Sequence, residues 1–582
     1  MAYVAFAFAL IQVADVVAGS YHWPDGVMHL LFGLLVLGFI VALLLAWYHG
    51  EQGRQQASGT ELLLIALVLA VGGGLLWRFA RVGPAGTDIA SAATLVHPAA
   101  SSTVAASRAA EPTPAAEAPA KSIAVLPFVN MSGDPKNDYF SDGITEEILD
   151  ALAQVPHLKV AARTSAFAFK GKSEDLRKVG EVLDVATVLE GSVQKSGDEV
   201  RITAQLIDTR SGYHLWSEKY DRKLTSIFAV EDEISKAITD KLQVQLAGGS
   251  GRTLVAQKTN DPLAHDFYLR GLTLLAARSV SEAVNAFQQA VSIDPSYAQA
   301  WASLAEAQAL LPAYGLDATQ IANANSLKSA QRALALDPNV ALGYVAQGMV
   351  YSNQMRWADA DHALRHALAL APGDAEVLNQ YAQFLEGVGQ LEPALVELDR
   401  ALQRDPLSGT SAAIRAQLRF ILHRDDAAAA AVQIKAILVA HPESLFVHRS
   451  AILIYLNLHR YPEAEAQSRA ASALNGTDPE AKTLLVRGIA DAAQRTRAVQ
   501  SLETSPANAD LRHDAVLHAY FLIQLSERDR ALAVLDDGAA NGTALPQLLW
   551  FPAFDPIRND PRFKAALKKM GLPYTPVGAA KP

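Results

Sequence analysis

The stretch AVNAFQQAVSIDPSYAQAW (residues 283–301) recurs in altered form three more times along the 582-residue chain. The later copies read SAQRALALDPNVALGY, ADHALRHALALAPGDAEVL and ALVELDRALQRDPLSGT. Each copy contains a proline, and Pro338, Pro372 and Pro406 follow one another at intervals of 34 residues. Because proline cannot continue a helix, each one ends a helix and sets the turn into the next. The period therefore predicts a stack of helix–turn–helix units.

Small residues recur between these prolines, because the two helices of one unit cross closely and leave room only for glycine or alanine. The predicted repeat-signature positions are Gly271, Ala283, Phe287, Ala290, Pro295, Trp301, Pro338, Tyr344, Gly348, Ala360, Ala367, Pro372, Ala382, Ala394, Ala401 and Pro406. This pattern is the tetratricopeptide signature. It predicts an all-α superhelix over residues 260–582 whose concave face binds a protein or peptide, over too broad an area to assign single residues.

Two parts of the repeat region depart from the period. The second unit has about nine extra residues around LLPAYGLDAT. Beyond Pro406, Pro442 and Pro479 follow at irregular spacing. We therefore expect degenerate repeats there, followed by a capping segment, LWFPAFDPIRNDPRFKAALKKMGL, whose basic RFKAALKKM stretch is the solvated face of a helix.

A different architecture is predicted for residues 121–246. SIAVLPFV, LKVAAR and YHLWSEKYDR are typical of strands. VATVLEGSVQKS and EVRITAQLIDTR are joined by the turn SGDE, which predicts a hairpin. SEDLRKVGEVLD predicts a helix capped by Ser173, and residues 227–246 predict a closing helix. This order of elements predicts an α/β or α+β domain.

The stretch SDGITEEI (residues 141–148) concentrates polar groups and has the look of an active site. No histidine or lysine is placed to activate Ser141. We expect instead a helix N-terminus, with Ser141 or Asp142 as its cap and Gly143 easing the turn into the helix. Glu146 and Glu147 would then favour the positive end of the helix dipole.

Residues 121–246 resemble the TolB N-terminal-like domain of bacterial adenylate-cyclase-associated and CadC-type membrane regulators. The resemblance is carried by IAVLPFVNMSGDPKNDYFSDGITEEI, LKVAARTSAFAFKG, ATVLEGSVQKSGDEVRITAQLIDTRSGYHLWSEKYDR and IFAVEDEI. In that family, membrane helices often precede the domain and tetratricopeptide repeats often follow it. A DNA-binding, cyclase or kinase domain often begins the chain, and we expect none within this sequence.

The first 82 residues are predicted to form two to three membrane helices, at about 2–19, 27–47 and 61–79. The middle segment has no charged residue and is about as long as a bilayer-spanning helix needs to be. A count of arginines beside the segments slightly favours a cytoplasmic C-terminal part. The resemblance implies the opposite, a bacterial inner-membrane protein with its C-terminal domains in the periplasm, and we follow the resemblance.

An Ala- and Pro-rich linker is predicted for residues 83–120, because this segment has no apolar period with which to build a core. A second, glycine-containing linker at residues 247–259 would join the α/β domain to the repeats. The predicted fold class is therefore multidomain, with membrane helices, an α/β domain and an all-α superhelix.

No catalytic, cofactor-binding or metal site is predicted. The net charge of −10 disfavours a nucleic-acid partner, and the absence of cysteine excludes disulfides and cysteine-ligated zinc. FKGKS ends like a phosphate-binding loop, but Ala166 replaces the leading glycine. His362 and His366 share a helix face without an obvious third ligand. No G-x-S-x-G motif occurs.

Two functions remain. The first is a membrane-anchored, non-enzymatic scaffold that binds a protein or peptide partner. The second is a signal-transduction sensor that lacks, or is separated from, its DNA-binding or cyclase domain. The sequence does not identify the partner or the oligomeric state.

Overall fold

The computed structural model describes residues 121–153, 155, 157–223, 227–242, 259, 261–277, 279–314 and 319–573, which belong to one compact unit of the chain. The predicted membrane helices and the 83–120 linker lie outside these residues, as does most of the 247–259 linker. Within the described ranges, no helix is both long enough and apolar enough to cross a membrane.

A six-stranded sheet forms the first part of the described chain, in the order β3-β1-β4-β5-β6 with β2 beside β4. Its strands are β1 (Ser122–Val125), β2 (Val129–Asn130), β3 (Lys159–Val160), β4 (Thr187–Ser196), β5 (Glu199–Asp208) and β6 (His214–Lys223). Strand β1 pairs in parallel with β3 and β4, and β2 pairs in parallel with β4, whereas β4, β5 and β6 form an antiparallel meander. The predicted β4–β5 hairpin is confirmed, with Gly197 in its turn at a φ of 62°.

Helices cover the sheet because its strands bury alternate residues on opposite faces. Helices α4 (Asp138–Ala153) and α7 (Ile227–Lys241) pack on the face that carries Ile123 and Leu189. Helix α6 (Leu176–Leu183) packs on the other face, against Ala124 and Val188.

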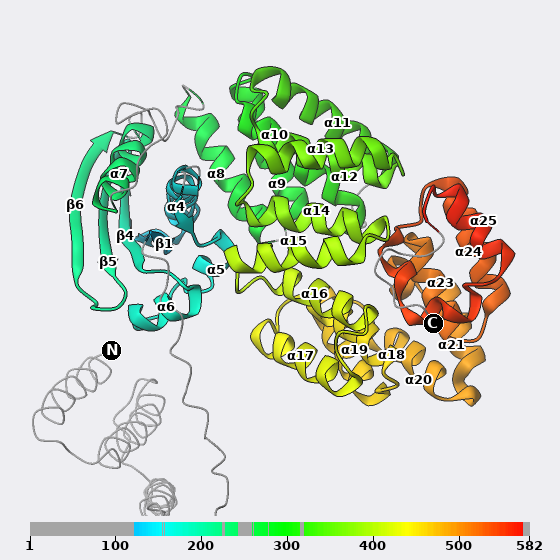
Figure 1. Cartoon of the computed structure of the whole chain (residues 1–582). Helices are drawn as coiled ribbons and strands as arrows, with labels where there is room; N and C mark the ends of the chain where they lie inside the picture. The colour runs from blue at the N-terminus through cyan, green and yellow to red at the C-terminus, as the bar shows by residue number, and fades with distance from the viewer. Residues whose placement is uncertain are drawn as a thin grey trace, which may run out of the picture. The chain divides into compact units, whose positions relative to one another are not determined.

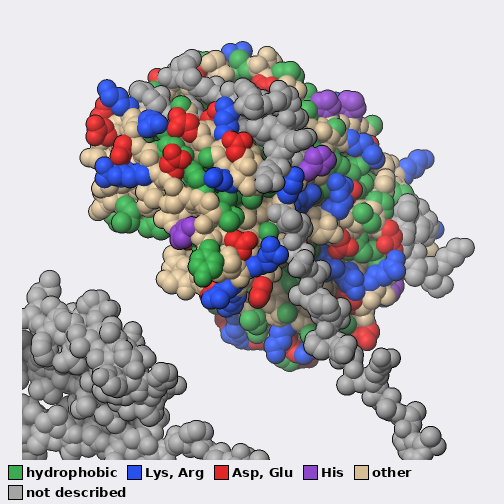
Figure 2. All heavy atoms as spheres, turned by 60° about the vertical axis from the view of Figure 1, so that its left-hand side comes forward, with side chains coloured by type: hydrophobic (Ala, Val, Ile, Leu, Met, Phe, Trp, Pro, Cys, Tyr) green, Lys and Arg blue, Asp and Glu red, His purple; other side chains and the backbone are tan. Residues whose placement is uncertain are grey.

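On the side of the molecule seen in Figure 2, Lys/Arg and Asp/Glu side chains are interspersed, and ion pairs such as that between Arg201 and Asp221 neutralise charges of β5 and β6.

The predicted N-terminus at SDGITEEI is wrong. Helix α4 begins at Asp138, after a short 3-10 turn (Pro135–Asn137), so Ser141 and Asp142 lie inside the helix and are buried. Asp142 pairs with Lys170 Nζ at 2.5 Å. Gly143 does not serve a turn. It lies against Leu269, and a Cβ placed on it would come within 2.6 Å of that side chain.

The predicted cap of the next helix is also wrong. Helix α6 is capped by Asp175, whose carboxylate accepts from the Arg177 N–H at 2.9 Å, and not by Ser173 two residues earlier. A carboxylate accepts a stronger hydrogen bond from an N–H group than a hydroxyl does. A short helix that the sequence analysis missed, α5 (Arg163–Phe167), precedes α6.

Eight antiparallel helix pairs follow in the described residues, and a final helix ends the row. The pairs are α8 (Pro262–Ala276) with α9 (Val280–Ile293), α10 (Ala298–Leu310) with α11 (Thr319–Leu336), α12 (Ala341–Asn353) with α13 (Trp357–Leu370), α14 (Ala375–Gly387) with α15 (Leu391–Arg404), α16 (Gly409–Ile421) with α17 (Ala427–Ala440), α18 (Leu445–Asn457) with α19 (Tyr461–Asn475), α20 (Pro479–Ala490) with α21 (Arg495–Thr504), and α23 (Ala515–Gln524) with α24 (Arg528–Asn541). The C-terminal cap is η6 (Pro546–Trp550), η7 (Pro552–Ile557) and α25 (Pro561–Lys569). Figure 1 shows the pairs stacked in a curved row, the helical repeat superhelix of this chain.

The 36-residue interval between Pro406 and Pro442 has a simple local cause. Pro442 is the second residue after α17, just as Pro406 is the second residue after α15. The interval between them is 36 residues because the α16–α17 turn is two residues longer than the three-residue α14–α15 turn. The α16–α17 pair is therefore as regular as those before it. The extra residues of the second unit lie in a 3-10 turn (Leu311–Tyr314), in the segment after it and in a longer α11.

One hydrophobic core joins the sheet to the first helix pairs. Ile144 and Ile148 of α4 belong to the same buried cluster as Leu269 of α8, Phe287 of α9 and Tyr297. Figure 1 shows α4 between the sheet and α8. The sheet region (residues 121–242) is therefore packed directly onto the start of the helical repeats.

Candidate protein-binding groove

A large groove, with a volume of 2650 Å³, runs along the inner side of the helix pairs. Its lining comes mainly from the first helix of each pair, from Tyr268 on α8 to Phe521 on α23. Helices α4 and α5 of the sheet region add one wall, which includes Glu146, Arg163 and Thr164. The groove is therefore built jointly by the sheet region and the repeats.

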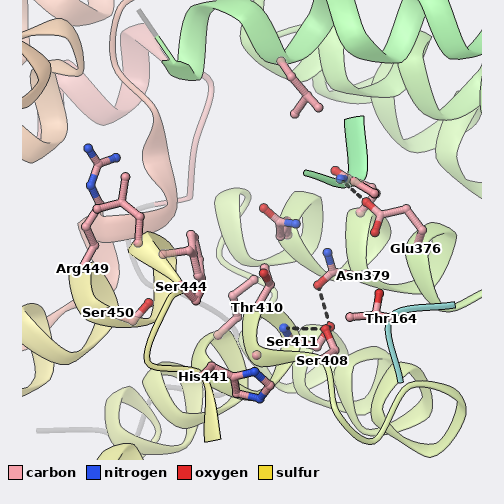
Figure 3. A pocket seen from close by; sticks show the side chains of 18 of the residues that line it. Thr164, Glu376, Asn379, Ser408, Thr410, Ser411, His441, Ser444, Arg449 and Ser450 are labelled. Atoms are coloured by element: carbon pink, nitrogen blue, oxygen red, sulfur yellow. Dashed lines mark hydrogen bonds between the residues drawn. The ribbon is translucent and has the colours of Figure 1, made fainter. Parts of the chain in front are cut away.

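The middle of the groove is rich in uncharged hydrogen-bonding groups. Ser411 on α16 donates to Asn379 Oδ1 on α14 at 3.2 Å, and Ser408 donates to Ser411 Oγ at 3.1 Å. Figure 3 shows these residues facing the same space as Thr410 and Thr164. Asparagine and serine can both donate and accept. This part of the groove can therefore bind the N–H and C=O groups of an extended backbone.

A charged cluster lies further along the groove. Asp510, from the short helix α22 (Ala509–His513), pairs with Arg449 of α18 at 2.9 Å and also with Lys482 of α20. Burial lowers the pKa of Lys482, and Asp510 opposes that effect. Two cations share one carboxylate, which leaves this cluster with one net positive charge.

A buried glutamate lies near the end of α14. Glu386 lines the groove and is 3 % exposed. Burial alone raises its pKa to about 8. Its backbone carbonyl accepts from Trp550 Nε1 of the C-terminal cap at 2.6 Å, so the cap closes over this end of α14.

Helix α5 is held to the repeats by hydrogen bonds. The residue before it, Ala162, offers no side-chain cap, and its N–H donates to the Arg404 carbonyl at 2.9 Å. Ser165 Oγ donates to Asp405 Oδ1 at 2.5 Å and accepts from the Leu407 N–H at 2.8 Å. Asp405 also accepts from the Thr164 hydroxyl and the Ser165 N–H, so it caps α5 from 240 residues away. Burial raises the pKa of Asp405, and these hydrogen bonds oppose the rise.

The signature residues build the scaffold behind the groove, and none of the sixteen lines it. A Cβ on Gly271 would come within 2.4 Å of Phe287, and one on Gly348 within 2.4 Å of Leu364. The alanines Ala283, Ala290, Ala360, Ala367, Ala382, Ala394 and Ala401 are fully buried. Pro295, Pro338, Pro372 and Pro406 lie in the turns between pairs.

The two aromatic signature residues make contacts within the scaffold. Trp301 Nε1 donates to the Pro295 carbonyl at 3.1 Å. Tyr344 contacts the ring of His366 at a centroid distance of 4.3 Å, and both His366 and His362 are exposed on α13. Among the described residues, no group of three or more His, Asp or Glu side chains could hold a metal ion.

The sequence analysis missed two glycines that, like Gly271 and Gly348, allow the two helices of a later pair to pack closely. A Cβ on Gly488 would come within 2.2 Å of Ala498, and one on Gly538 within 2.2 Å of Ala515. It also missed the groove residues themselves. The helical period could not have indicated them, because Asn379 and Glu386 lie three and four residues from the fully buried Ala382 and so share its side of α14.

Comparison with known proteins gives one curated relative and several similar structures. No family model matches the chain. "Putative adenylate cyclase 3" of Rhizobium meliloti (strain 1021) is 42 % identical over 262 residues, which is 44 % of this chain and 44 % of that protein. The chain therefore matches less than half the length of this relative.

The similar solved structures are helical-repeat proteins of low sequence identity. A tetratricopeptide repeat protein from Parabacteroides merdae ATCC 43184 is 16 % identical, with a TM-score of 0.29, and the match covers 46 % of this chain and 99 % of that one. YrrB, a tetratricopeptide protein with an unusual peptide-binding site, is 18 % identical with a TM-score of 0.23, over 33 % of this chain and 93 % of that one. Since these scores are low, the repeat architecture rests on the helix pairs described above.

Proposed function

We propose that this chain is a protein-interaction scaffold whose groove binds an extended segment of a partner protein. The observation that carries the proposal is the groove itself, lined by the first helices of successive pairs and polar in its middle. Its 2650 Å³ exceeds the roughly 300–1,000 Å³ typical of small-molecule pockets. An extended segment presents backbone donors and acceptors along its whole length, which suits Asn379, Ser408 and Ser411.

The remaining parts of the proposal come from the sequence. The first 82 residues would anchor the chain in a bacterial inner membrane, and the linker would carry the described domains into the periplasm. The sheet region would act as a TolB-like docking or sensing module. The chain would bind its partner without catalysing a reaction on it.

Site-specific photo-crosslinking in the full chain tests the groove. A photoreactive residue at Asn379 is expected to form an adduct with a partner protein in the native membrane. The same residue at Val432, which is 69 % exposed on α17 and does not line the groove, is the matched control. The adduct should disappear when Ser408 and Ser411 are both changed to leucine. Equal adducts at both positions would contradict the proposal.

A second candidate function is a sensor in a signalling system. The observation that favours it is the 42 % identity to a protein that is named as an adenylate cyclase. Deletion of the encoding gene would then change cellular cyclic AMP, and the full chain would restore it. Unchanged cyclic AMP after deletion would remove the support for this candidate.

A further inference from the structure

Glu386 is an acidic residue of the groove whose carboxylate has neither a countercharge nor a full set of hydrogen bonds among the described residues. Its Oε1 atom is buried and has no hydrogen-bond partner among the described residues. The neighbouring Gly387 lies against η6, since a Cβ there would come within 3.4 Å of Pro546 and 3.6 Å of Gln547. The end of α14 next to this carboxylate is therefore packed against neutral residues of the cap.

The groove cations that form ion pairs use other carboxylates. Arg163 pairs with Glu146 at 2.8 Å, while Arg449 and Lys482 share Asp510. No charged neighbour contributes to the raised pKa of Glu386, for which burial is the whole cause. Taking an ionised carboxylate out of water without a countercharge is costly. A cation that entered the groove beside Glu386 would supply both the charge and the missing hydrogen bond.

We propose that the partner segment places a lysine or arginine side chain against Glu386. This inference rests on the proposed function, because it names one feature of the segment that the groove would bind. An acidic side chain at the same place would add a second carboxylate where burial is the whole cause of the raised pKa of Glu386 and no cation offsets it. A metal ion would lack protein ligands, since no group of three or more His, Asp or Glu side chains occurs in the described residues.

The geometry of α14 also fixes where the cation lies in the segment. Asn379 and Glu386 are seven residues apart on one helix, which is about two turns or ~10 Å along its axis. An extended chain covers ~10 Å in about three residues. The lysine or arginine is therefore expected about three residues from the point where the segment backbone meets Asn379.

The test uses the full chain in lipid nanodiscs and a displayed library of random linear peptides. Peptides selected on the wild type are expected to carry lysine or arginine at one fixed position. Changing that residue to methionine should weaken binding about 30-fold or more on the wild type. On Glu386→Gln the same peptide change should cost less than about 3-fold, because the charge it contacted is gone. Glu386→Asp, which keeps the charge, should retain the preference in part.

The control removes a carboxylate that lies outside the groove. Glu282→Gln changes an exposed residue of α9 that does not line the groove, and it should behave as the wild type does. Peptides selected without a fixed cation, peptides enriched in acidic residues, or an equal loss on Glu386→Gln would each overturn the inference and leave peptide binding standing. Failure to select any peptide would overturn the proposed function together with it.

Discussion

Helix α4 meets α8 across an apolar contact, whereas helix α5 meets the α15–α16 turn through hydrogen bonds. In the first contact Gly143 lies directly on Leu269, inside the core that joins the sheet to the repeats. In the second, Ser165 and Asp405 are both buried, and their hydrogen bond is the centre of the contact. The first contact gains from burying apolar surface, and the second depends on a few directional bonds.

The difference bears on how the groove is closed. The apolar contact fixes the sheet region to the start of the repeats, and it cannot open without exposing the shared core. The polar contact places α5 in the groove wall, and water can replace its hydrogen bonds. We therefore expect α5 to open locally more often than α4.

The largest expected effect comes from breaking the apolar contact. Gly143→Val places a Cβ within 2.6 Å of Leu269, so the two helices must separate. We expect a loss of about 3 kcal/mol in the free energy of unfolding, as for overpacked cores. The midpoint of thermal unfolding of the full chain measures it. The control is Ala153→Val, an exposed position on the same helix. A midpoint equal to that of the control would mean that α4 and α8 do not depend on close packing.

Much of the fold could be predicted because its causes are local. The β4–β5 hairpin follows from alternation and a turn glycine, and the helix pairs up to α17 follow from prolines two residues past a helix end. The role of Gly143 could not be predicted, because its neighbour Leu269 is 126 residues away. The helix that contains it begins at Asp138, so the polar residues that look like a cap are inside the helix.

The candidate site was harder to predict, because the same Asp-Pro dipeptide makes different hydrogen bonds at different places in the chain. Asp294 and Asp337 precede a proline just as Asp405 does, and each bonds the backbone two residues on, at 2.9 Å. Asp405 instead turns to α5, whose position no local pattern reveals. Glu386 is buried partly because η6 returns to α14 from more than 150 residues later. These contacts depend on tertiary structure, which is why sequence patterns do not contain them.

Glu386 is a buried carboxylate like Asp405, but its Oε1 atom has no hydrogen-bond partner among the described residues. Its effect on stability should therefore show the cost of burying a carboxylate without hydrogen bonds. The pKa of Glu386 is raised from 4.5 to about 8, so the folded chain holds a proton that the unfolded chain releases. Stability therefore falls as pH rises from about 4.5 to about 8. Glu386→Gln should therefore gain stability over the wild type as pH rises from about 4.5 to about 8, and should equal it near pH 4.5. Thermal midpoints across this range measure the difference. A constant difference at all pH values would contradict the prediction.

The polar contact can be weakened without touching the apolar one. Ser165→Ala removes the hydroxyl that bonds Asp405 and Leu407, and we expect a loss of about 1–2 kcal/mol. Hydrogen exchange should rise in α5 and in residues 405–408, with α4 unchanged. Ser173→Ala, at an exposed serine of the same region, is the control. Faster exchange in α4 as well would show that the two contacts are not independent.

The smallest effect is expected at the polar rim of the apolar contact. Tyr139 donates to Asp266 Oδ1 at 2.5 Å, the same distance as in the Ser165–Asp405 bond. Asp266 is also held by Lys195 at 3.2 Å and by Arg270 at 2.9 Å, so Tyr139→Phe leaves it two cations. The ring stays, with Arg270 at 4.7 Å from its centre.

Tyr139→Phe should therefore cost about 0.5 kcal/mol, less than Ser165→Ala despite the equal distances. Burial, chiefly, raises the pKa of Tyr139 to about 12, so its hydroxyl is protonated near neutral pH, where the comparison is made. Tyr213→Phe, at a tyrosine that is 76 % exposed on the same region, is the matched control. Thermal midpoints of the three variants decide the order. If Tyr139→Phe lowers the free energy of unfolding as much as Ser165→Ala does, the hydrogen bonds at the edge of the α4–α8 contact, and not its apolar core, stabilise that contact.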